Sequence, residues 1–239
     1  MSQRDPKLDE MSRIQSVYAE RDGIQKSSLY AWHRSEVRVQ QSEKELTISA
    51  ALANALGNDL SNAKILDVGC GNGGFLRTLV DWGAQPMNLI GTEYLEDRLD
   101  HARRCSPSGI KWHLGGLGEV SSSDFDLVTT NTVFSSILDP NERLALSREI
   151  WRVLKPGGWL LVFDFRYNNP SNRNVHKVTT KELKNYWKEG INSQNKTLLL
   201  APPLARRIIP LSPLLGSLMT KLFPFLRSHF CFMLQKPKL

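Results

Sequence analysis

The sequence has 239 residues, and its 31 basic and 24 acidic side chains give a formal net charge of +7. This length suits one domain with a terminal extension, and no stretch approaches the roughly 18 uninterrupted apolar residues of a membrane-spanning helix. The three cysteines are odd in number and lack metal-ligand spacing, which favours a reduced cytosolic setting. From the polar, mixed-charge N-terminus we expect no secretory signal. We therefore expect a cytoplasmic protein.

The N-terminal part precedes the regular strand–helix pattern. Helices are predicted over residues 8–20 and 36–57, with an irregular aromatic segment over 23–34 between them. We expect residues 1–44 to form a helical lid on a domain that spans residues 45–239.

Strands and helices then alternate along the chain. Strands are predicted at 64–68, 88–92, 110–114, 125–130, 158–164, 195–201 and 228–235. Helices are predicted at 74–82, 95–104, 141–153 and 180–188. This alternation indicates an α/β fold, a Rossmann-like sheet of seven strands that is mostly parallel and has helices on both faces.

A glycine-rich turn follows the first strand. Ile65, Leu66 and Val68 form an apolar strand, and Gly69-x-Gly71-x-Gly73 then removes the Cβ atoms that would keep a ligand away from the backbone. Because the next helix begins here, its free N–H groups face the same place. The turn predicts a site for a nucleotide-like ligand.

Two acids near the turn indicate which nucleotide it is. Asp67 lies two residues before Gly69, where a carboxylate would repel a pyrophosphate and attract a cation. Glu93 ends the second strand and can accept both hydroxyls of a ribose. S-adenosylmethionine carries an ammonium, a sulfonium and no phosphate. The glycines alone also fit the G-x-G-x-x-G spacing of a dinucleotide fold, so a dehydrogenase stays an alternative.

With these features the chain resembles the class I S-adenosylmethionine-dependent methyltransferases. ILDVGCGNGG (65–74) resembles the first motif of that family, IGTEY (90–94) its acidic second motif and FDLVTTN (125–131) its fourth strand. WRVLKPGG (151–158) followed by WLLVFDF resembles the helix, turn and strand that end the core. The resemblance implies S-adenosylmethionine as cofactor, S-adenosylhomocysteine as product and an antiparallel final strand.

A narrower likeness is to uncharacterised methyltransferases encoded among bacterial polysaccharide or secondary-metabolite genes. Its carriers are TVFSSILDP (132–140), DFRYNNP (164–170), LAPPLARR (200–207) and FPFLRSH (223–229). This likeness implies a role in polysaccharide or natural-product biosynthesis and brings no established substrate.

The resemblance also implies a set of cofactor contacts. We expect these from Tyr18, Asp67, Gly69, Cys70, Gly71, Gly73, Glu93, Tyr94, Gly116, Leu117, Asn131 and Thr132. The family usually has an acid after the third strand to read adenine. Here LGGLG (114–118) stands at that place, so we expect backbone groups of 115–117, or Glu119, to hold the base.

A hydroxyl acceptor needs a base near neutral pH, and histidine suits that task. His33 is the leading candidate, followed by His176, with Asp164 as an alternative base. Tyr30, Trp32, Phe134, Arg166, Tyr167 and Asn168 are predicted to contact the substrate. Packing and a hydrogen-bonded loop are the competing interpretations of these residues. We expect no metal, because no second acid follows the fourth strand.

The net charge is concentrated at the C-terminal end. Glu189 is the last acid, and residues 190–239 contain seven bases, so the whole formal +7 lies in this segment. Within it, the segment over residues 201–227 is apolar as well. It is an ordinary packed insertion, a lid over a greasy or anionic substrate, or, through 206–227, a peripheral contact with the inner membrane face.

These features predict methyl transfer to a small molecule, first of all the hydroxyl of a sugar, a glycan precursor or a secondary metabolite, with a lipid-linked or anionic acceptor in view of the C-terminal segment. N- or C-methylation of a small molecule and nucleic-acid methylation are the alternatives. Against nucleic acid, no base-reading tetrapeptide follows the fourth strand, and the charge forms no aromatic-interleaved face. A module that only binds the cofactor is a further alternative.

Overall fold

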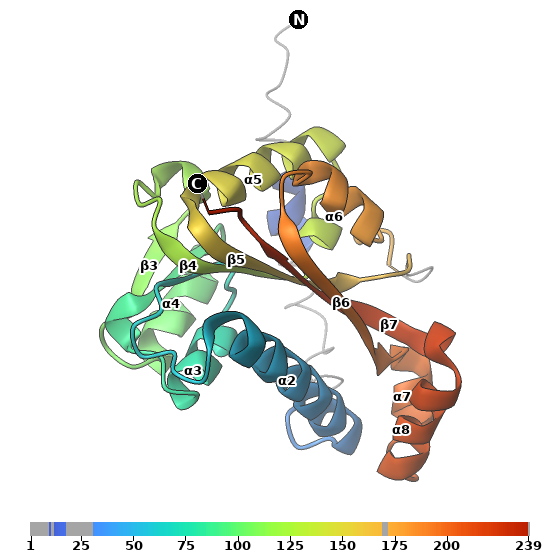
Figure 1. Cartoon of the computed structure of the whole chain (residues 1–239). Coiled ribbons are helices and arrows are strands. Elements are labelled where there is room, and N and C mark those ends of the chain that lie inside the picture. The colour runs from blue at the N-terminus through green and yellow to red at the C-terminus, as the bar shows by residue number, and fades with distance from the viewer. Residues whose placement is uncertain (1–9, 11, 18–30, 169–171, 239) are drawn as a thin grey trace, which may run out of the picture.

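The computed structural model describes residues 10, 12–17, 31–168 and 172–238. A seven-stranded sheet in the order β3-β2-β1-β4-β5-β7-β6 forms its centre (Figure 1). Its strands are β1 (Ile65–Val68), β2 (Leu89–Glu93), β3 (Lys111–Leu114), β4 (Phe125–Asn131), β5 (Leu154–Phe165), β6 (Ile191–Leu200) and β7 (Arg227–Gln235). Its longer helices are α2 (Ser35–Leu56), α3 (Gly74–Asp81), α4 (Glu96–Cys105), α5 (Pro140–Val153), α6 (Thr180–Tyr186), α7 (Pro202–Ile208) and α8 (Pro213–Leu222).

The first five strands are parallel, and β7 is antiparallel to both of its neighbours, β5 and β6. The predicted Rossmann-like, mostly parallel sheet with an antiparallel final strand is confirmed. The order reverses at β1, which lies between β2 and β4. In such sheets the carboxyl ends of the two central strands leave a crevice for a ligand.

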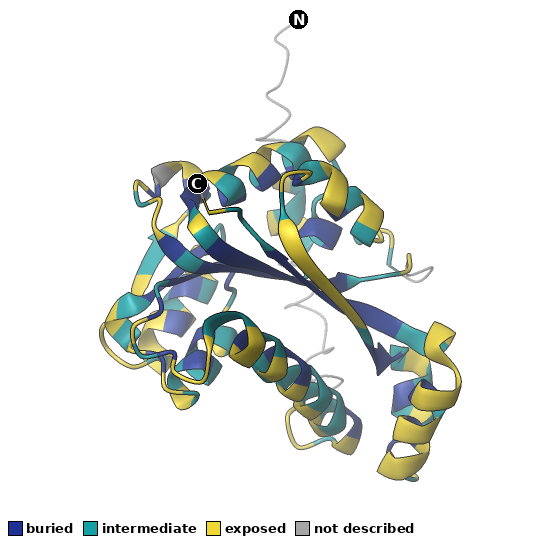
Figure 2. Cartoon of the chain, viewed as in Figure 1, coloured by how far each residue is buried: buried dark blue, intermediate teal, exposed yellow. Residues whose placement is uncertain are grey.

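Helices cover both faces of the sheet. α2, α3 and α4 pack on one face through residues such as Ile48, Leu79 and Leu99, and α5 and α6 pack on the other through Ile150 and Leu183 (Figure 1). The central strands are therefore buried on both sides, as Figure 2 shows in dark blue. Two apolar clusters, one on each face, result.

Two strands begin several residues earlier than predicted. β5 begins at Leu154 rather than 158. β6 begins at Ile191 rather than 195, because an exposed polar edge strand carries no apolar alternation, and its pairing shifts between Ile191 and Gln194. α2 spans Ser35–Leu56, close to the predicted helix 36–57, and runs without a break across the proposed division between residues 44 and 45.

Two short helices, α7 and α8, and a 3₁₀ turn η5 (Pro224–Leu226) connect β6 to β7. They lie where β6 ends and β7 begins, beside the end of β5, because Phe165 pairs with His229. The insertion therefore occupies the same edge of the sheet as the crevice. None of the helices formed by the described residues is both long and apolar enough to cross a bilayer.

Candidate functional site

The glycine turn leaves β1 and enters α3. Gly69, Gly71 and Gly73 have φ angles of 66°, 53° and 72°, a region that favours glycine. A Cβ on Gly69 would lie 2.7 Å from Val133, and one on Gly73 would lie 2.6 Å from Trp112. A Cβ on Gly71 would meet only Arg98, at 3.8 Å. Packing thus requires two of the glycines, whereas Gly71 borders open space where a ligand can lie.

Glu93 joins the end of β2 to this turn. One carboxylate oxygen accepts a hydrogen bond from the Gly71 N–H at 2.9 Å, and the other accepts from the Tyr94 N–H at 2.7 Å. The structure therefore brings together the acid and the glycines that the sequence predicted as one site. Both oxygens lie at the carboxyl ends of β1 and β2, beside the crevice.

Asp67 lies below the turn and is buried. Its carboxylate accepts hydrogen bonds from Thr129 Oγ1 at 2.6 Å and from Asn131 Nδ2 at 3.4 Å. Burial raises the pKa of Asp67 to about 6, although the Thr129 hydrogen bond and nearby Lys44 act in the opposite direction. The side-chain oxygen of Asn131 is buried and has no hydrogen-bond partner among the described residues. This acceptor is available to a ligand donor.

The backbone after β4 adopts an uncommon conformation. Thr132 has a φ of 57°, which is costly for a residue with a branched Cβ. Its N–H donates to the Phe163 carbonyl at 2.8 Å, and its side chain donates to the Asn131 carbonyl at 2.7 Å. The structure thus places the predicted residues Asn131 and Thr132 together, next to Asp67.

Lys44 was not predicted, yet it lies in this region. Its ammonium lies 4.4 Å from the ring centroid of Phe163, near the end of β5. Burial lowers the pKa of Lys44, and the charge of Asp67 opposes this shift. Lys44 stands four residues before Ile48 and eight before Leu52, both buried on the core side of α2. A lysine in line with the buried residues of a predicted helix was the sequence signal that could have identified it.

His229 at the start of β7 also belongs to this region. Its ring stacks on Phe163 with a centroid separation of 5.1 Å and on Phe165 at 4.2 Å. Burial and the charge of Lys44 lower the pKa of His229 to about 3, so the imidazole is neutral. Sequence reasoning treated it only as the first residue of a strand.

Two further predicted cofactor contacts, Tyr94 and Gly116, lie against each other. The Tyr94 side chain lies against Gly116, where any Cβ would collide with its hydroxyl. Leu117 is buried in the core, and the Cys70 sulfur lies under Gly91. Both can therefore offer a ligand only their backbone groups. Tyr18, Tyr30 and the side chain of Glu119 lie outside the described parts of the chain.

The candidate bases have three different environments. His33 is exposed just before α2. The backbone N–H of His176 donates to the Ser135 carbonyl at 2.9 Å, which places this exposed histidine near the ends of β4 and β5. Asp164 is fully buried and accepts from the N–H groups of Ser135 and Phe165 at 3.1 and 2.8 Å; burial raises its pKa to about 6. The expectation that Asp164 is a base needs correction, because its oxygens hold the backbone.

Two predicted substrate contacts also need correction. Phe134 is fully buried among Tyr186 and Trp187, on the face of the sheet opposite to Asp67. Arg166 stacks on Tyr167 and donates to the carbonyls of Pro224 and Arg227 at 3.3 and 3.0 Å, so it ties β5 to the insertion rather than clamping an anion.

The remaining predicted contacts lie at the surface. Trp32 and Tyr167 are exposed, and Trp32 faces the Arg38 guanidinium at 5.7 Å. Asn168 accepts from the Lys177 N–H at 2.7 Å, as in the hydrogen-bonded loop that was the competing interpretation.

The described N-terminal residues pack beside the same edge. Glu10 accepts from the Leu138 N–H at 2.7 Å, and Arg13 donates to the Ser136 carbonyl at 2.5 Å. These contacts fix the N-terminal segment just beyond Asn131 and Thr132. The lid expected over residues 1–44 stays a prediction.

Comparisons with known proteins agree with this geometry. Residues 65–158 match the family described as "Methyltransferase domain". Demethylmenaquinone methyltransferase from Deinococcus radiodurans is 33% identical over 121 residues, which cover 48% of each chain. The chain thus spans half or less of the length of the curated relatives it matches.

Solved structures share the fold. A SAM dependent methyltransferase from Archaeoglobus fulgidus superimposes with a TM-score of 0.57 at 17% identity, over 80% of this chain and 94% of that one. Phosphoethanolamine N-methyltransferase 2 from Haemonchus contortus, in complex with S-adenosyl-L-methionine, gives 0.59 at 17% identity, over 82% and 52%. Residues 65–158 thus match a methyltransferase domain, and the fold is the one that S-adenosylmethionine-dependent methyltransferases of known structure share.

Proposed function

We propose that the protein binds S-adenosylmethionine at the glycine turn and catalyses transfer of its methyl group to a small-molecule acceptor. The main support for this proposal is the hydrogen bond between the Gly71 N–H and Glu93. It joins the glycine turn, which would lie against the methionine part of the cofactor, to the carboxylate that would accept the ribose hydroxyls. The residues fit the cofactor: Glu93 offers acceptors to a diol, and Asn131 offers an unpaired buried acceptor to a donor such as an ammonium. When bound, the cofactor supplies a methyl group on a positively charged sulfur.

The protein's own task is then alignment, exclusion of water and, for a hydroxyl acceptor, removal of a proton. The N-terminal segment held by Glu10 and Arg13 would close the crevice. His33 and His176 remain the proposed bases. Lys44 lies in the same region, with its ammonium 4.4 Å from the ring centroid of Phe163.

The acceptor is proposed only as a small molecule. The names of the relatives include demethylmenaquinone and phosphoethanolamine, which differ greatly in polarity. They give no particular support to the sugar or glycan hydroxyl expected from the sequence, so that acceptor and a biosynthetic role remain sequence-based proposals. N- and C-methylation remain alternatives.

Transfer of a labelled methyl group from S-adenosylmethionine to a panel of quinols, phenols, sugars and tRNA tests the function. His33→Ala should lower turnover by roughly 100-fold or more, as for a general base, while cofactor affinity stays unchanged. His101→Ala, at an exposed position on α4, is the control. Equal turnover in both variants would exclude His33 as the base, and no labelled product from any acceptor class would contradict methyl transfer.

A further inference from the structure

Helix α8 turns its apolar side chains away from the protein. Leu214, Leu218 and Leu222 follow one another at four-residue spacing and are 83%, 50% and 62% exposed. The residues that α8 buries are instead Gly216 and Thr220. A surface helix ordinarily buries its apolar stripe against the core, so this helix is inverted.

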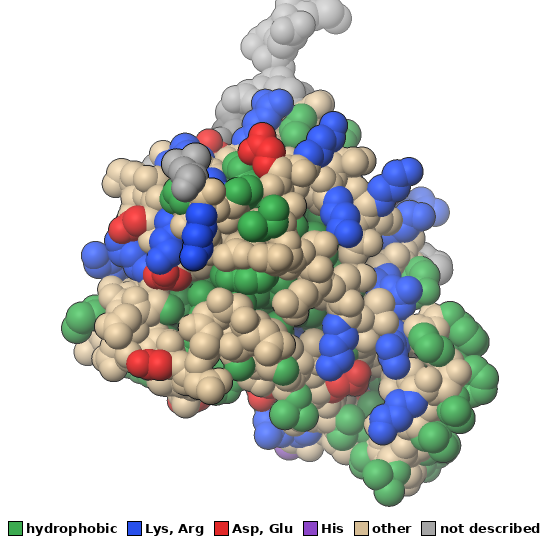
Figure 3. All heavy atoms as spheres, in the orientation of Figure 1, with side chains coloured by type: hydrophobic (Ala, Val, Ile, Leu, Met, Phe, Trp, Pro, Cys, Tyr) green, Lys and Arg blue, Asp and Glu red, His purple; other side chains and the backbone are tan. Residues whose placement is uncertain are grey.

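The exposed stripe belongs to a larger surface, which we call the apolar face. Its members are exposed leucines and phenylalanines of the insertion: Leu211, Leu214, Leu215, Leu218, Leu222, Phe223 and Phe225. Figure 3 shows the insertion as a green region that projects from the body of the protein. Single exposed apolar residues such as Met87 need no explanation, whereas a contiguous group this large indicates a binding surface.

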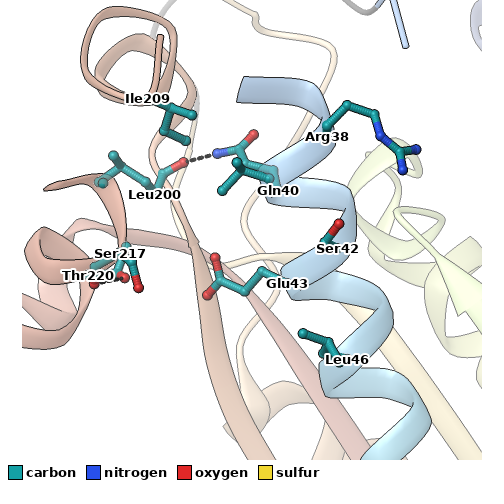
Figure 4. Close-up of a pocket in the computed structure, with 11 residues that line it drawn as sticks. Arg38, Gln40, Ser42, Glu43, Leu46, Leu200, Ile209, Ser217 and Thr220 are labelled. Atoms are coloured by element: carbon teal, nitrogen blue, oxygen red, sulfur yellow. Dashed lines mark hydrogen bonds between the residues drawn. The ribbon is translucent and has the colours of Figure 1, made fainter. Parts of the chain in front are cut away.

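Contacts on the opposite side of α8 fix this orientation. Gly216 packs so closely on Ile209 of the preceding segment that a Cβ would lie 2.8 Å from the isoleucine side chain. Gly216, Ser217 and Thr220 face α2 across a cavity of about 390 Å³ (Figure 4). Rotating α8 to bury its leucines would put a large side chain where only glycine fits. The apolar face is therefore held outward by packing.

The insertion itself carries bases and no acid, and the nearby acids Glu36 and Glu43 belong to α2. Glu189 is the last acid of the sequence, and the bases that follow include Arg206, Arg207, Lys221 and Arg227. Arg207 and Lys221 are exposed on α7 and α8. Arg227 is held by the Thr220 carbonyl at 2.9 Å and by Thr197 Oγ1 at 3.3 Å. Figure 3 shows blue side chains beside the green region.

We propose that the apolar face docks the protein on the surface of an anionic phospholipid bilayer, with its leucines and phenylalanines among the acyl chains and its bases at the headgroups. A bilayer supplies both an apolar layer and negative charge, which is the combination this surface complements. Self-association is disfavoured, because two copies would bring like charges together.

The position of the insertion indicates how membrane docking would help the reaction. This part of the inference rests on the proposed function. Arg166, directly after β5, donates to the carbonyls of Pro224 and Arg227 at 3.3 and 3.0 Å. The insertion is thereby tied to the strand end beside the crevice. Docking would hold the acceptor side of the crevice at the membrane surface. An acceptor that partitions into lipid could then enter without crossing bulk water.

Sedimentation of the 239-residue protein with vesicles tests the proposal. The wild type should pellet with vesicles of phosphatidylcholine and phosphatidylglycerol and should pellet much less with phosphatidylcholine alone. Leu214→Ser/Leu218→Ser should lower vesicle affinity by roughly tenfold or more, because two exposed leucines lose their apolar contact. Met87→Ser, an equally exposed site elsewhere, should bind like the wild type.

A second pair of variants tests the contribution of the bases. Arg207→Gln/Lys221→Gln should reduce the preference for anionic vesicles, and Arg104→Gln/Lys111→Gln is its control.

Three results would overturn the proposal: no pelleting of the wild type, pelleting that the leucine substitutions leave unchanged, or a dimer in light scattering that those substitutions dissociate in the absence of vesicles. Circular dichroism and calorimetric titration with S-adenosylhomocysteine accompany each variant. Vesicle binding is measured without cofactor. It can therefore be lost while cofactor binding persists, and cofactor binding can be lost while vesicle binding persists. The two proposals are thus tested separately.

Discussion

The glycine-turn region and the C-terminal insertion use similar sequence patterns with opposite outcomes. In α3, Leu76 and Leu79 are fully buried against the sheet. In α8, Leu214 and Leu218 stand at comparable helical spacing and are exposed. Periodicity thus identifies an apolar face of a helix, but it does not reveal what covers that face. The neighbouring contacts decide.

The two helices, α3 and α8, pack against different parts of the protein. α3 is fixed between β1 and β2 by the glycine turn, since Gly73 packs against Trp112 and Ala102. α8 packs through its small residues, with Gly216 against Ile209, and a cavity lies between it and α2. One helix completes the core of the domain, whereas the other presents a surface.

The sharpest test of this comparison is a pair of substitutions within the insertion. Ile209→Ala should lower the free energy of unfolding by roughly 2–5 kcal/mol, because a buried isoleucine leaves a cavity. Leu218→Ala should change it by less than about 0.5 kcal/mol, because the side chain faces solvent. Denaturant titration measures both. Equal losses would mean that α8 buries its leucines, which would refute the inverted orientation.

Glycine-to-alanine substitutions test the turn in the same way. Gly73→Ala should cost about 2–4 kcal/mol of stability, from the left-handed backbone and the collision with Trp112. Gly83 also has a positive φ, of 100°, but a Cβ there would meet no atom within 4 Å, so Gly83→Ala should cost only the backbone part, about 1 kcal/mol. If the two variants unfold at the same denaturant concentration, Trp112 does not constrain the turn.

Glu93→Ala should weaken S-adenosylmethionine binding by roughly 1–3 kcal/mol through loss of a charged hydrogen-bond acceptor. Isothermal calorimetry measures this. Glu189→Ala, an exposed acid before β6, serves as the control and should bind as the wild type does. An unchanged affinity in Glu93→Ala would remove Glu93 from the site.

Cofactor affinity should depend on pH through Asp67. Its pKa is raised to about 6 by burial, so the apo protein holds a proton there at lower pH. A cationic ligand favours the carboxylate, so affinity should be highest above this pKa and fall by up to about tenfold for each pH unit below it. Asp67→Asn should bind more weakly and show little of this dependence. A wild-type affinity that rises on acidification would contradict the placement of a cation near Asp67.

Much of the fold and the grouping of residues at the candidate site could be predicted, because both depend on local patterns. A buried strand leads into Gly69-x-Gly71-x-Gly73, and an acid stands at the end of the next strand. This local pattern predicts a strand–turn–helix unit and the contact between Glu93 and Gly71. Strand alternation likewise predicted the parallel sheet. The edge strand β6 was placed too late in the sequence because its first residues are exposed and polar.

The acceptor side could not be predicted equally well, because long-range packing determines it. Phe134 follows the fourth strand as a contact residue would, yet its ring fills the core between α5 and α6. Asp164 ends a strand as a base would, yet it holds backbone N–H groups. Lys44 and His229 meet at Phe163 from distant parts of the sequence. No local pattern contains such information.

The central claim is that the glycine turn with Asp67 and Glu93 binds S-adenosylmethionine rather than a dinucleotide. Isothermal calorimetry with S-adenosylmethionine, S-adenosylhomocysteine and NADH tests it most directly. We predict micromolar binding of the first two and no heat from NADH. Heat from NADH alone would contradict the account and identify the turn as a dinucleotide site.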